Sequence, residues 1–390
     1  MKQNHITGYF EKMLDNCYDY VENAKKEGRP VVGIMCEYTP RELIMAAGAV
    51  PVCLCGGSAD TISCAERDLP NNLCPLIKST YGYHVEKSNP FLEWADLVVA
   101  ETTCDGKKKM FELMGEKRPL YILELTQKTN DREALGHWTA ELRKLKAELE
   151  RRFSVRINRE KILRATEAMN RERFLKRRLA ELMKKDNPPL TGRQLLDLKS
   201  IISCIPEDLR QYEKILEFLE NKQEDPRGDA RVRVLLTGTP LVHGAERVMD
   251  IIEKYGGLVV CAENCTGVKP VLEDVDIKEK DLIKALAEKY FRHPCSVMTP
   301  NDSRFGQISS LVGEYKARCV IELVWQTCLT YDVESFYVKK LCREKLGIPY
   351  LKIQTDYSPS DTARIVSRIE ALFETVRART SINLLALPGE

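Results

Sequence analysis

Six cysteines stand at positions that the surrounding pattern places in loops, most of them directly after a short apolar run typical of a β-strand. They are Cys36, Cys74, Cys104, Cys265, Cys295 and Cys328. A thiolate at the carboxyl end of a strand points into the crevice where open α/β sheets bind their ligands. Several such thiolates in a chain without a secretion signal indicate soft-metal ligands, and iron–sulfur clusters are the leading interpretation.

The spacing of these six cysteines differs from that of short metal-binding motifs. None of them belongs to a C-x-x-C pair of the kind found in zinc ribbons and ferredoxins. Two interpretations therefore stay open at this level: ligands of a metal centre assembled from distant segments, or buried cysteines that pack as small hydrophobic side chains. Positions in loops after strands favour the functional interpretation.

Seven other cysteines lie inside helical or strand-like patterns, where core packing is the expected role. A free buried cysteine behaves as a small hydrophobic residue. Those in helical or apolar patterns are Cys17, Cys204, Cys319 and Cys342, and those in strand-like runs are Cys53, Cys55 and Cys261.

Eight apolar runs rich in β-branched residues predict the strands that position the six loop cysteines. Helical patterns separate the runs, and this alternation predicts parallel βαβ units. After the first run, Thr39 and Glu42 around Pro40 have the pattern of a capping box at a helix start. The runs span residues 31–35, 50–55, 96–102, 119–125, 232–238, 257–264, 319–325 and 348–355.

The middle of the chain differs from both ends, because residues from about 133 to 225 combine helical periodicity with abundant charge. A polar segment with Pro and Gly at 221–230 is typical of a linker. The sequence therefore predicts an α/β fold with two open parallel-sheet domains, Rossmann- or flavodoxin-like, and a helical insert. The predicted parts are 1–132, the N-terminal α/β domain; 133–230, the helical segment and linker; and 231–390, the C-terminal α/β domain.

Composition narrows the functional classes. The chain has 390 residues, a formal net charge of +2 and 43% hydrophobic residues, which argues against a dedicated nucleic-acid binder. No stretch approaches the roughly 18 apolar residues of a membrane span. The first 20 residues have an amphipathic helical pattern without the apolar core of a signal peptide, so we expect a cytoplasmic location.

Charged residues beside the loop cysteines are candidates for proton and charge control. Lys107, Lys108 and Lys109 follow Cys104 and can supply positive charge to a metal centre, although a solvated helix start is the simpler expectation. Carboxylates near strand ends relay protons in some sites and cap helices or form ion pairs in others. Glu37 and Glu101 are the candidate catalytic relays, and the weaker candidates are Glu263, Glu322 and His293.

Two histidines and one glycine-containing turn carry no catalytic pattern. His84 and His243 lack partner residues at motif spacing, so structural roles are expected. Gly238-Thr239-Pro240 follows a strand but lacks the lysine and the further glycines of a phosphate-binding loop. The sequence thus predicts that this chain does not hydrolyse ATP.

Five segments around the cysteines resemble one family. LPNNLCPLIKSTYG, ETTCDGKKKMFELMG, ENCTGVKP, CSVMTPN and QTCLTYDVES are similar to the 2-hydroxyacyl-CoA dehydratase superfamily, which includes benzoyl-CoA reductase subunits and double-cubane cluster proteins. The segment MCEYTPRELIMAAGAVPV resembles the first βα unit of that superfamily. The likeness covers nearly the whole chain, and this single-chain form most resembles the double-cubane cluster protein.

The resemblance implies roles for the cysteines. Cys74, Cys104 and Cys328 match the three ligands of the four-iron cluster in dehydratase subunits. Cys36, Cys265 and Cys295 are the further candidates for an 8Fe–9S double cubane, with Cys55 in reserve for Cys36. The resemblance also implies a separate ATP-hydrolysing iron–sulfur activator, a small-molecule substrate and a homodimer.

Three functional readings follow from these observations. The first is an oxidoreductase component with a double-cubane cluster. The second is a (R)-2-hydroxyacyl-CoA dehydratase subunit, a lyase with a single 4Fe–4S cluster. The third is a zinc-bound or metal-free scaffold of the same fold, because thiolates also suit zinc.

Overall fold

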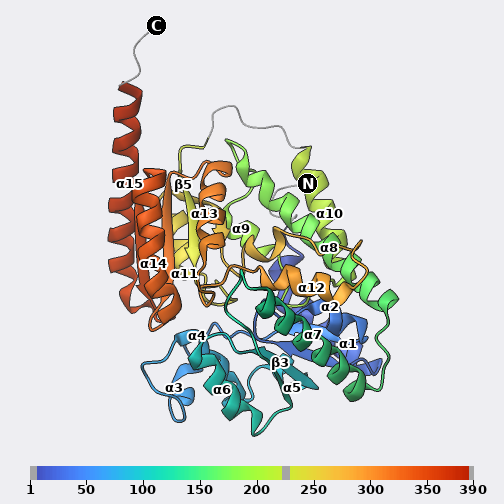
Figure 1. The fold of residues 1–390 in the computed structure, drawn as a ribbon. Coiled ribbons are helices and arrows are strands. Elements are labelled where there is room, and N and C mark those ends of the chain that lie inside the picture. The colour runs from blue at the N-terminus through green and yellow to red at the C-terminus, as the bar shows by residue number, and fades with distance from the viewer. Residues whose placement is uncertain (1–6, 222–228, 386–390) are drawn as a thin grey trace.

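Two four-stranded parallel sheets, one from each half of the chain, form the centre of the protein (Figure 1). The structure is a computed structural model that describes residues 7–221 and 229–385. Every strand-like run of the sequence forms a strand, so the predicted fold class is confirmed. The first sheet has the order β2-β1-β3-β4, from β1 (Val31–Ile34), β2 (Val50–Cys53), β3 (Leu97–Glu101) and β4 (Leu120–Leu123). The second has the order β6-β5-β7-β8, from β5 (Val232–Gly238), β6 (Gly257–Glu263), β7 (Cys319–Trp325) and β8 (Tyr350–Thr355).

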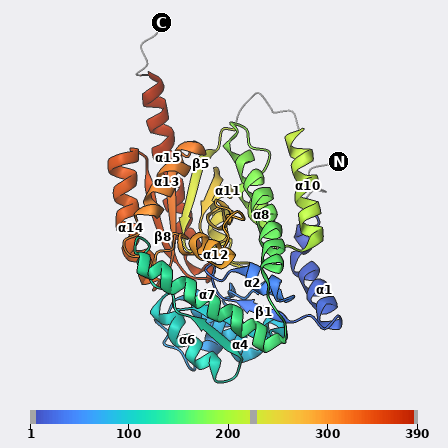
Figure 2. The same cartoon turned by 45° about the vertical axis from the view of Figure 1, so that its right-hand side comes forward.

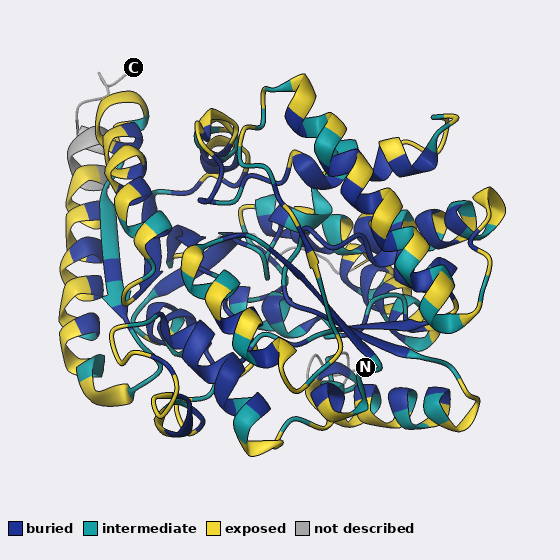
Figure 3. Ribbon diagram, turned by 60° about the horizontal axis from the view of Figure 1, so that its bottom comes forward, coloured by how far each residue is buried: buried dark blue, intermediate teal, exposed yellow. Residues whose placement is uncertain are grey.

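The central strands are buried along their whole length and mostly apolar, because helices cover both faces of each sheet. Every residue of β1, β3, β5 and β7 is buried. In Figure 3 the central strands are dark blue and the edge strand β8 is largely teal, whereas the outer faces of the surrounding helices are yellow. The strand order places a topological switch point between β1 and β3, and another between β5 and β7. Ligands of doubly wound sheets bind at the carboxyl ends of the strands at such points.

Helices connect the strands and fill the segment between the two sheets. The N-terminal helices are α1 (Met13–Lys26), α2 (Arg41–Ala46), α3 (Ile62–Ala65), α4 (Pro75–Glu86), α5 (Pro90–Trp94) and α6 (Asp105–Gly115). The middle segment forms α7 (Arg132–Phe153), α8 (Arg159–Glu181), α9 (Gly192–Asp197) and α10 (Pro206–Glu220). The C-terminal half adds α11 (Arg247–Lys254), α12 (Leu282–Phe291), α13 (Asp302–Glu314), α14 (Leu329–Leu341) and α15 (Thr362–Leu385).

The start of α2 differs from the predicted capping box. Pro40 is the N-cap residue, and no side chain caps the helix. The Thr39 hydroxyl instead donates a hydrogen bond to Glu101 of β3, and Glu42 pairs with Arg173 of α8. Long-range partners replace the local bonds because both side chains are fully buried, where an ion pair or a hydrogen bond is required.

The two halves share one of their cores. α12, from the C-terminal half, packs against α7, and its apolar side chains join a cluster with residues of β1 and β3 (Figure 2). The domain divisions at residues 132 and 230 remain predictions. The predicted linker at 221–230 falls largely on residues 222–228, which lie outside the described residues.

A search of the described residues for helices able to cross a membrane gave none of sufficient length and apolarity.

Candidate functional site

Three of the predicted cysteines begin helices. Cys74, Cys104 and Cys328 are the N-cap residues of α4, α6 and α14. Backbone N–H groups of the first helical turn point at each sulfur: those of Leu76 and Ile77 at Cys74, and one each at the other two. The positive end of a helix macrodipole and these donors stabilise a thiolate.

These three thiols come together although they are far apart in sequence. Cys74 and Cys328 interact with each other, and this interaction lowers the pKa of Cys74 and raises that of Cys328. Cys104 lies close enough to both to interact electrostatically. Burial raises the pKa of Cys104, opposed by the Lys107 amide. The first group of thiols therefore joins two segments of the N-terminal half to one of the C-terminal half.

Cys36, Cys265 and Cys295 form a second group. Burial raises the pKa of Cys36, and the nearby Cys295 and Cys265 raise it further. The Cys265 sulfur lies 3.6 Å from Nε2 of His293. Cys104 interacts electrostatically with Cys295, so the two groups adjoin. The structure thus brings all six predicted cysteines into one region, and their role as ligands stays a prediction.

Lys107 is the cation of this region. Its Nζ donates to the Met35 carbonyl at 2.8 Å. Burial opposes its charge, but Cys36, Cys55 and Cys104 around it raise its pKa. The other two predicted lysines face away.

Lys108 pairs with Asp105 at 2.8 Å and Lys109 with Glu112 at 2.8 Å, all on the outer surface of α6. The expectation of a solvated helix start therefore holds for these two lysines, whereas the helical period turns Lys107 inward.

Glu101 and Glu37, the two predicted proton relays, have different surroundings. Glu101 is fully buried, and its Oε2 has no hydrogen-bond partner among the described residues. Burial raises the pKa of Glu101 to about 8, so it holds a proton at neutral pH. Glu37 forms a two-pronged pair with Arg41 at 2.8 and 2.9 Å. Burial alone would raise the pKa of Glu37, but the Arg41 guanidinium outweighs it and lowers that pKa.

The other predicted relay candidates are engaged in a structural network. Glu263 pairs with Lys269 at 2.7 Å, and Glu322 accepts from the Tyr350 hydroxyl at 2.7 Å. Arg304 of α13 lies between carboxylates of β6, β7 and α14. Burial lowers the pKa of His293 well below its usual range, so this imidazole is neutral. A buried ionic network of this kind needs all its members.

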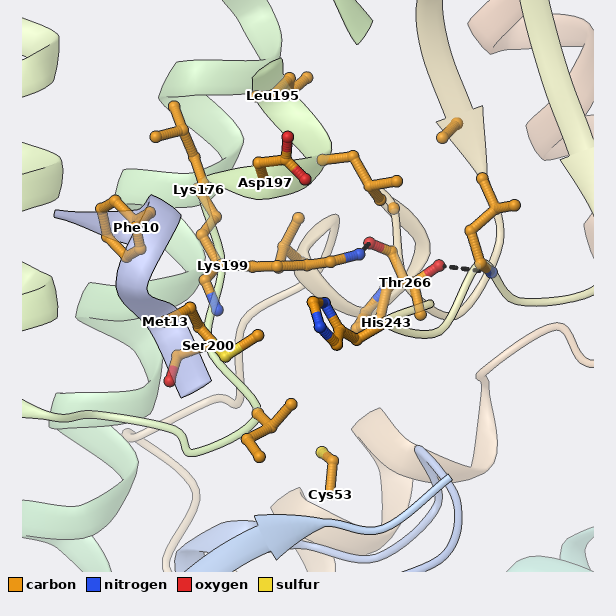
Figure 4. Close-up of a pocket in the computed structure, with 18 of the residues that line it drawn as sticks. Phe10, Met13, Cys53, Lys176, Leu195, Asp197, Lys199, Ser200, His243 and Thr266 are labelled. Carbon is orange, nitrogen blue, oxygen red and sulfur yellow. Dashed lines mark hydrogen bonds between the residues drawn. The ribbon is translucent and has the colours of Figure 1, made fainter. Parts of the chain in front are cut away.

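A cavity of about 670 Å³ reaches this region (Figure 4). Its walls come from the start of α1, from α8 and α9, and from the loops after β2 and β6. Cys53, Cys55 and Cys265 line it. The sequence did not reveal the cavity, because segments far apart in the chain enclose it.

Three of the cysteines expected to pack in the core also have other contacts, and two of them, Cys53 and Cys55, pack against a core as expected. Cys53 and Cys55 line the cavity, because the carboxyl end of β2 faces it. Cys204 is half-buried and donates to a Glu172 oxygen at 3.2 Å. The expectation is confirmed for the cysteines that are fully buried, which are Cys17, Cys261, Cys319 and Cys342.

The two histidines expected to be structural have different surroundings. His84 is buried, and its Nδ1 accepts a hydrogen bond from Nε of Arg118 at 2.6 Å. His243 is exposed and lines the cavity, 3.8 Å from Glu246.

Known proteins match along most of the chain. The profile of the family described as "2-hydroxyglutaryl-CoA dehydratase, D-component" matches residues 36–376. The chain belongs to the 2-hydroxyacyl-CoA dehydratase superfamily. It is 39% identical over 364 residues to "Putative dehydratase subunit YjiM" of Escherichia coli (strain K12), covering 91% of this chain and 93% of that protein.

Two more distant relatives carry dehydratase names. The "(R)-phenyllactyl-CoA dehydratase beta subunit" of Clostridium sporogenes is 22% identical over 380 residues, covering 94% of this chain and 99% of that protein. The "(R)-2-hydroxyglutaryl-CoA dehydratase, subunit beta" of Acidaminococcus fermentans is 20% identical over 385 residues, covering 94% of this chain and 98% of that protein. The resemblance drawn from the sequence is therefore confirmed at the level of the superfamily.

The donors of this region fit an iron–sulfur cluster. In residues 7–221 and 229–385, no three His, Cys, Asp or Glu side chains are arranged to hold a single metal ion. A cluster binds each thiolate through a different iron, so its ligands surround it rather than meet at one point. Helix-start amides and the Lys107 ammonium suit the negative charge of such a cluster.

Proposed function

We propose that this protein is an iron–sulfur reductase component that carries an 8Fe–9S double-cubane cluster and reduces a small molecule. The observation that supports this proposal is the pair of adjoining thiol groups, since each group draws cysteines from both halves of the chain. A single cubane needs only the first group, made of Cys74, Cys104 and Cys328. The second group, made of Cys36, Cys265 and Cys295, is what a second cubane requires.

The protein's own groups have separate tasks in this proposal. The cluster, when bound, supplies electrons one at a time. The Lys107 ammonium balances negative charge beside Cys36, Cys55 and Cys104. Glu101 holds a proton on a buried carboxyl near Cys36 and is the candidate donor when the substrate takes up electrons. The cavity gives the substrate access to the thiol region from the side of α9.

A second candidate function is a (R)-2-hydroxyacyl-CoA dehydratase subunit with a single 4Fe–4S cluster. The names of the relatives favour it, since they are called dehydratase subunits. This activity would make the protein a lyase rather than an oxidoreductase. It leaves the second group of thiols without a ligand role.

The test is the content of iron and acid-labile sulfide in protein purified without oxygen. About eight irons per chain support the double cubane, and about four support the dehydratase-type cluster. Replacing Cys265 by Ser should lower the count under the first proposal and leave it unchanged under the second. Colourless protein with zinc and no iron would overturn both.

Electrons must come from outside this chain in the proposed reaction. We propose a separate ATP-hydrolysing iron–sulfur activator, as the family resemblance implies, because no phosphate-binding motif occurs in this sequence. Purified chain should then reduce substrate only when an activator and ATP are both added. Reduction with ATP alone would overturn this part of the proposal.

We further propose that the chain pairs with a second copy through α14. This helix exposes four large apolar side chains at helical spacing directly after Cys328, and they are Leu329, Val333, Phe336 and Tyr337. An exposed apolar stripe of this size is typical of an interface. Sedimentation should show a dimer that Val333→Glu converts to monomer. A monomeric parent protein would contradict the pairing.

A further inference from the structure

The cavity holds two lysines that form no direct ion pair among the described residues. Lys199, just after α9, and Lys289 of α12 line it. Neither forms an ion pair with any carboxylate among the described residues, although many other lysines and arginines of the protein do. Both side chains are partly buried, so water reaches them less than it reaches the exposed lysines of the surface.

Lys199 has one hydrogen-bond partner within residues 7–221 and 229–385. Its Nζ donates to the Thr266 carbonyl at 2.8 Å, and Figure 4 shows the side chain extended across the cavity to reach it. An ammonium has three N–H donors, so two of them stay available on the cavity side. A glutamine would make the same bond to a carbonyl without the cost of burying a charge.

Lys289 repeats this arrangement. Its Nζ donates to the Pro270 carbonyl at 3.2 Å and lies 4.3 Å from the centre of the Tyr290 ring. Thr266 and Pro270 belong to the same loop, which also carries Cys265. Both lysines therefore donate to the loop that brings a candidate cluster ligand to the cavity.

The other cations near these lysines are already neutralised. Arg41 pairs with Glu37 at 2.8 Å, and Lys176 pairs with Glu172. Arg193 pairs with Asp197 at 2.9 Å. Glu246 also lines the cavity and attracts Lys199 from beyond ion-pair distance. Lys199 and Lys289 are therefore the enclosed cations that form no direct ion pair among the described residues.

We propose that this cavity binds a small organic anion and that Lys199 and Lys289 bind its oxyanion group beside Cys265. Two enclosed ammonium groups without a direct ion pair are costly, and a bound carboxylate or phosphate removes that cost. In line with this, burial lowers the pKa of both lysines to about 7. A volume of about 670 Å³ accepts a molecule of metabolite size.

The inference deepens the proposed function, because it names the chemical class of the substrate or of a group on it. A carboxylate of a small acid and a phosphate of a larger cofactor share the same oxyanion chemistry. The probes must therefore separate these two sources, and the measurement must not depend on turnover.

The experiment is calorimetric titration of oxygen-free full-length protein with four probes: succinate, its uncharged analogue succinamide, inorganic phosphate and coenzyme A. We expect one of the charged probes to bind and succinamide not to bind. Lys199→Met and Lys289→Met should each weaken that binding about ten- to a hundredfold, the usual loss for a charged hydrogen bond. Lys199→Arg should retain most of the affinity.

A matched control lies on the same helix as Lys289. Lys284 is exposed and pairs with Glu279 at 3.2 Å, so Lys284→Met should leave binding unchanged. The iron content of each sample is measured as well. Binding that depends on the two lysines in protein with a low iron count would support this inference and overturn the double-cubane proposal.

Several results decide against the inference. These are equal binding of succinamide, unchanged affinity in both methionine variants, or no binding by any of the four probes. Succinate binding that depends on the lysines assigns a carboxylate ligand. Binding of phosphate or coenzyme A with the same dependence assigns a phosphate-bearing one.

Discussion

The N-terminal and C-terminal halves of the molecule place a cysteine at the same position in the fold but surround it with different side chains. In each half the third strand in sequence, β3 or β7, runs into a cysteine that begins a helix. The thiol then accepts from the amide three residues further on, which belongs to Lys107 in one half and Tyr331 in the other. The backbone arrangement is therefore the same in both halves, but the residue that supplies the amide differs, since it is a lysine in one half and a tyrosine in the other.

The two halves therefore have the same backbone geometry around the cysteine but a different charge beside it. Lys107 places a cation among Cys36, Cys55 and Cys104. Tyr331 is buried near Cys265 and Cys295, and its hydroxyl has no partner among the described residues. The parallel sheet fixes where the thiols lie, and one residue on the following helix decides which charge they meet.

The largest expected effect concerns the two equivalent cysteines. Cys104→Ser and Cys328→Ser should each remove at least half of the iron per chain, because each deletes a ligand of the same cluster. Iron analysis with a colorimetric chelator measures this. Cys342→Ala, at a buried cysteine outside the site, should keep the full count. A full count in either serine variant would break the equivalence of the halves.

The second effect tests the ionic network found in the C-terminal half. Arg304→Met leaves the carboxylates of Glu263, Glu322 and Glu334 without their shared cation. We expect a loss of about 3–5 kcal/mol in the free energy of unfolding, the usual result of removing one member of a buried ion pair. Urea denaturation measures it, with Arg364→Met on the exposed face of α15 as the control. A loss below about 1 kcal/mol would contradict the network.

A third effect makes the N-terminal half sensitive to acid. Burial, with Arg118 beside it, lowers the pKa of His84 to about 4, against about 6.5 in the unfolded chain. Because the unfolded state takes up this proton first, stability is lost as the pH falls below 6.5. Between pH 7 and pH 5 the loss from this residue is about 2 kcal/mol.

His84→Gln should therefore flatten the pH dependence of unfolding by about that amount, measured by denaturation at both pH values. The same change at His137, which is partly exposed on α7, should have little effect. An unchanged slope in the His84 variant would show that the folded protein does accept the proton.

The smallest expected effect sharpens the contrast between Lys107 and Tyr331. Lys107→Met removes a positive charge, which makes reduction of a bound cluster harder and lowers its midpoint potential by on the order of 50 mV. Tyr331→Phe removes no charge and should shift it less. Potentiometric titration followed by electron paramagnetic resonance compares them. Equal shifts would show that the two halves do not differ in the way proposed.

Much of the fold follows from local sequence patterns. The strands were predictable because a strand buried on both faces needs a continuous apolar run, which is visible without its neighbours. Parallel pairing followed from the helical patterns between the runs. The positions of Cys36, Cys104 and Cys328 after strands then followed, because the carboxyl ends of parallel strands share one edge.

The same local reasoning failed where distant segments decide. Thr39 and Glu42 resembled a capping box, but buried partners on β3 and α8 took their hydrogen bonds. Cys53 was expected in a core but also lines a cavity, because the edge strand β2 ends at a space that other segments enclose. Contacts between segments far apart in the chain cannot be predicted from the spacing of residues within one segment.

The sequence by itself determined two parallel sheets and the placement of thiols at their carboxyl edges, since hydrophobic periodicity and chain order are local properties. The tertiary structure alone decided that Lys107 faces the thiols while Lys108 and Lys109 face solvent. It also decided that Lys199 and Lys289 meet the loop of Cys265 across one cavity. The physical reason is that the partner of a buried charge is chosen by packing between segments far apart in the chain.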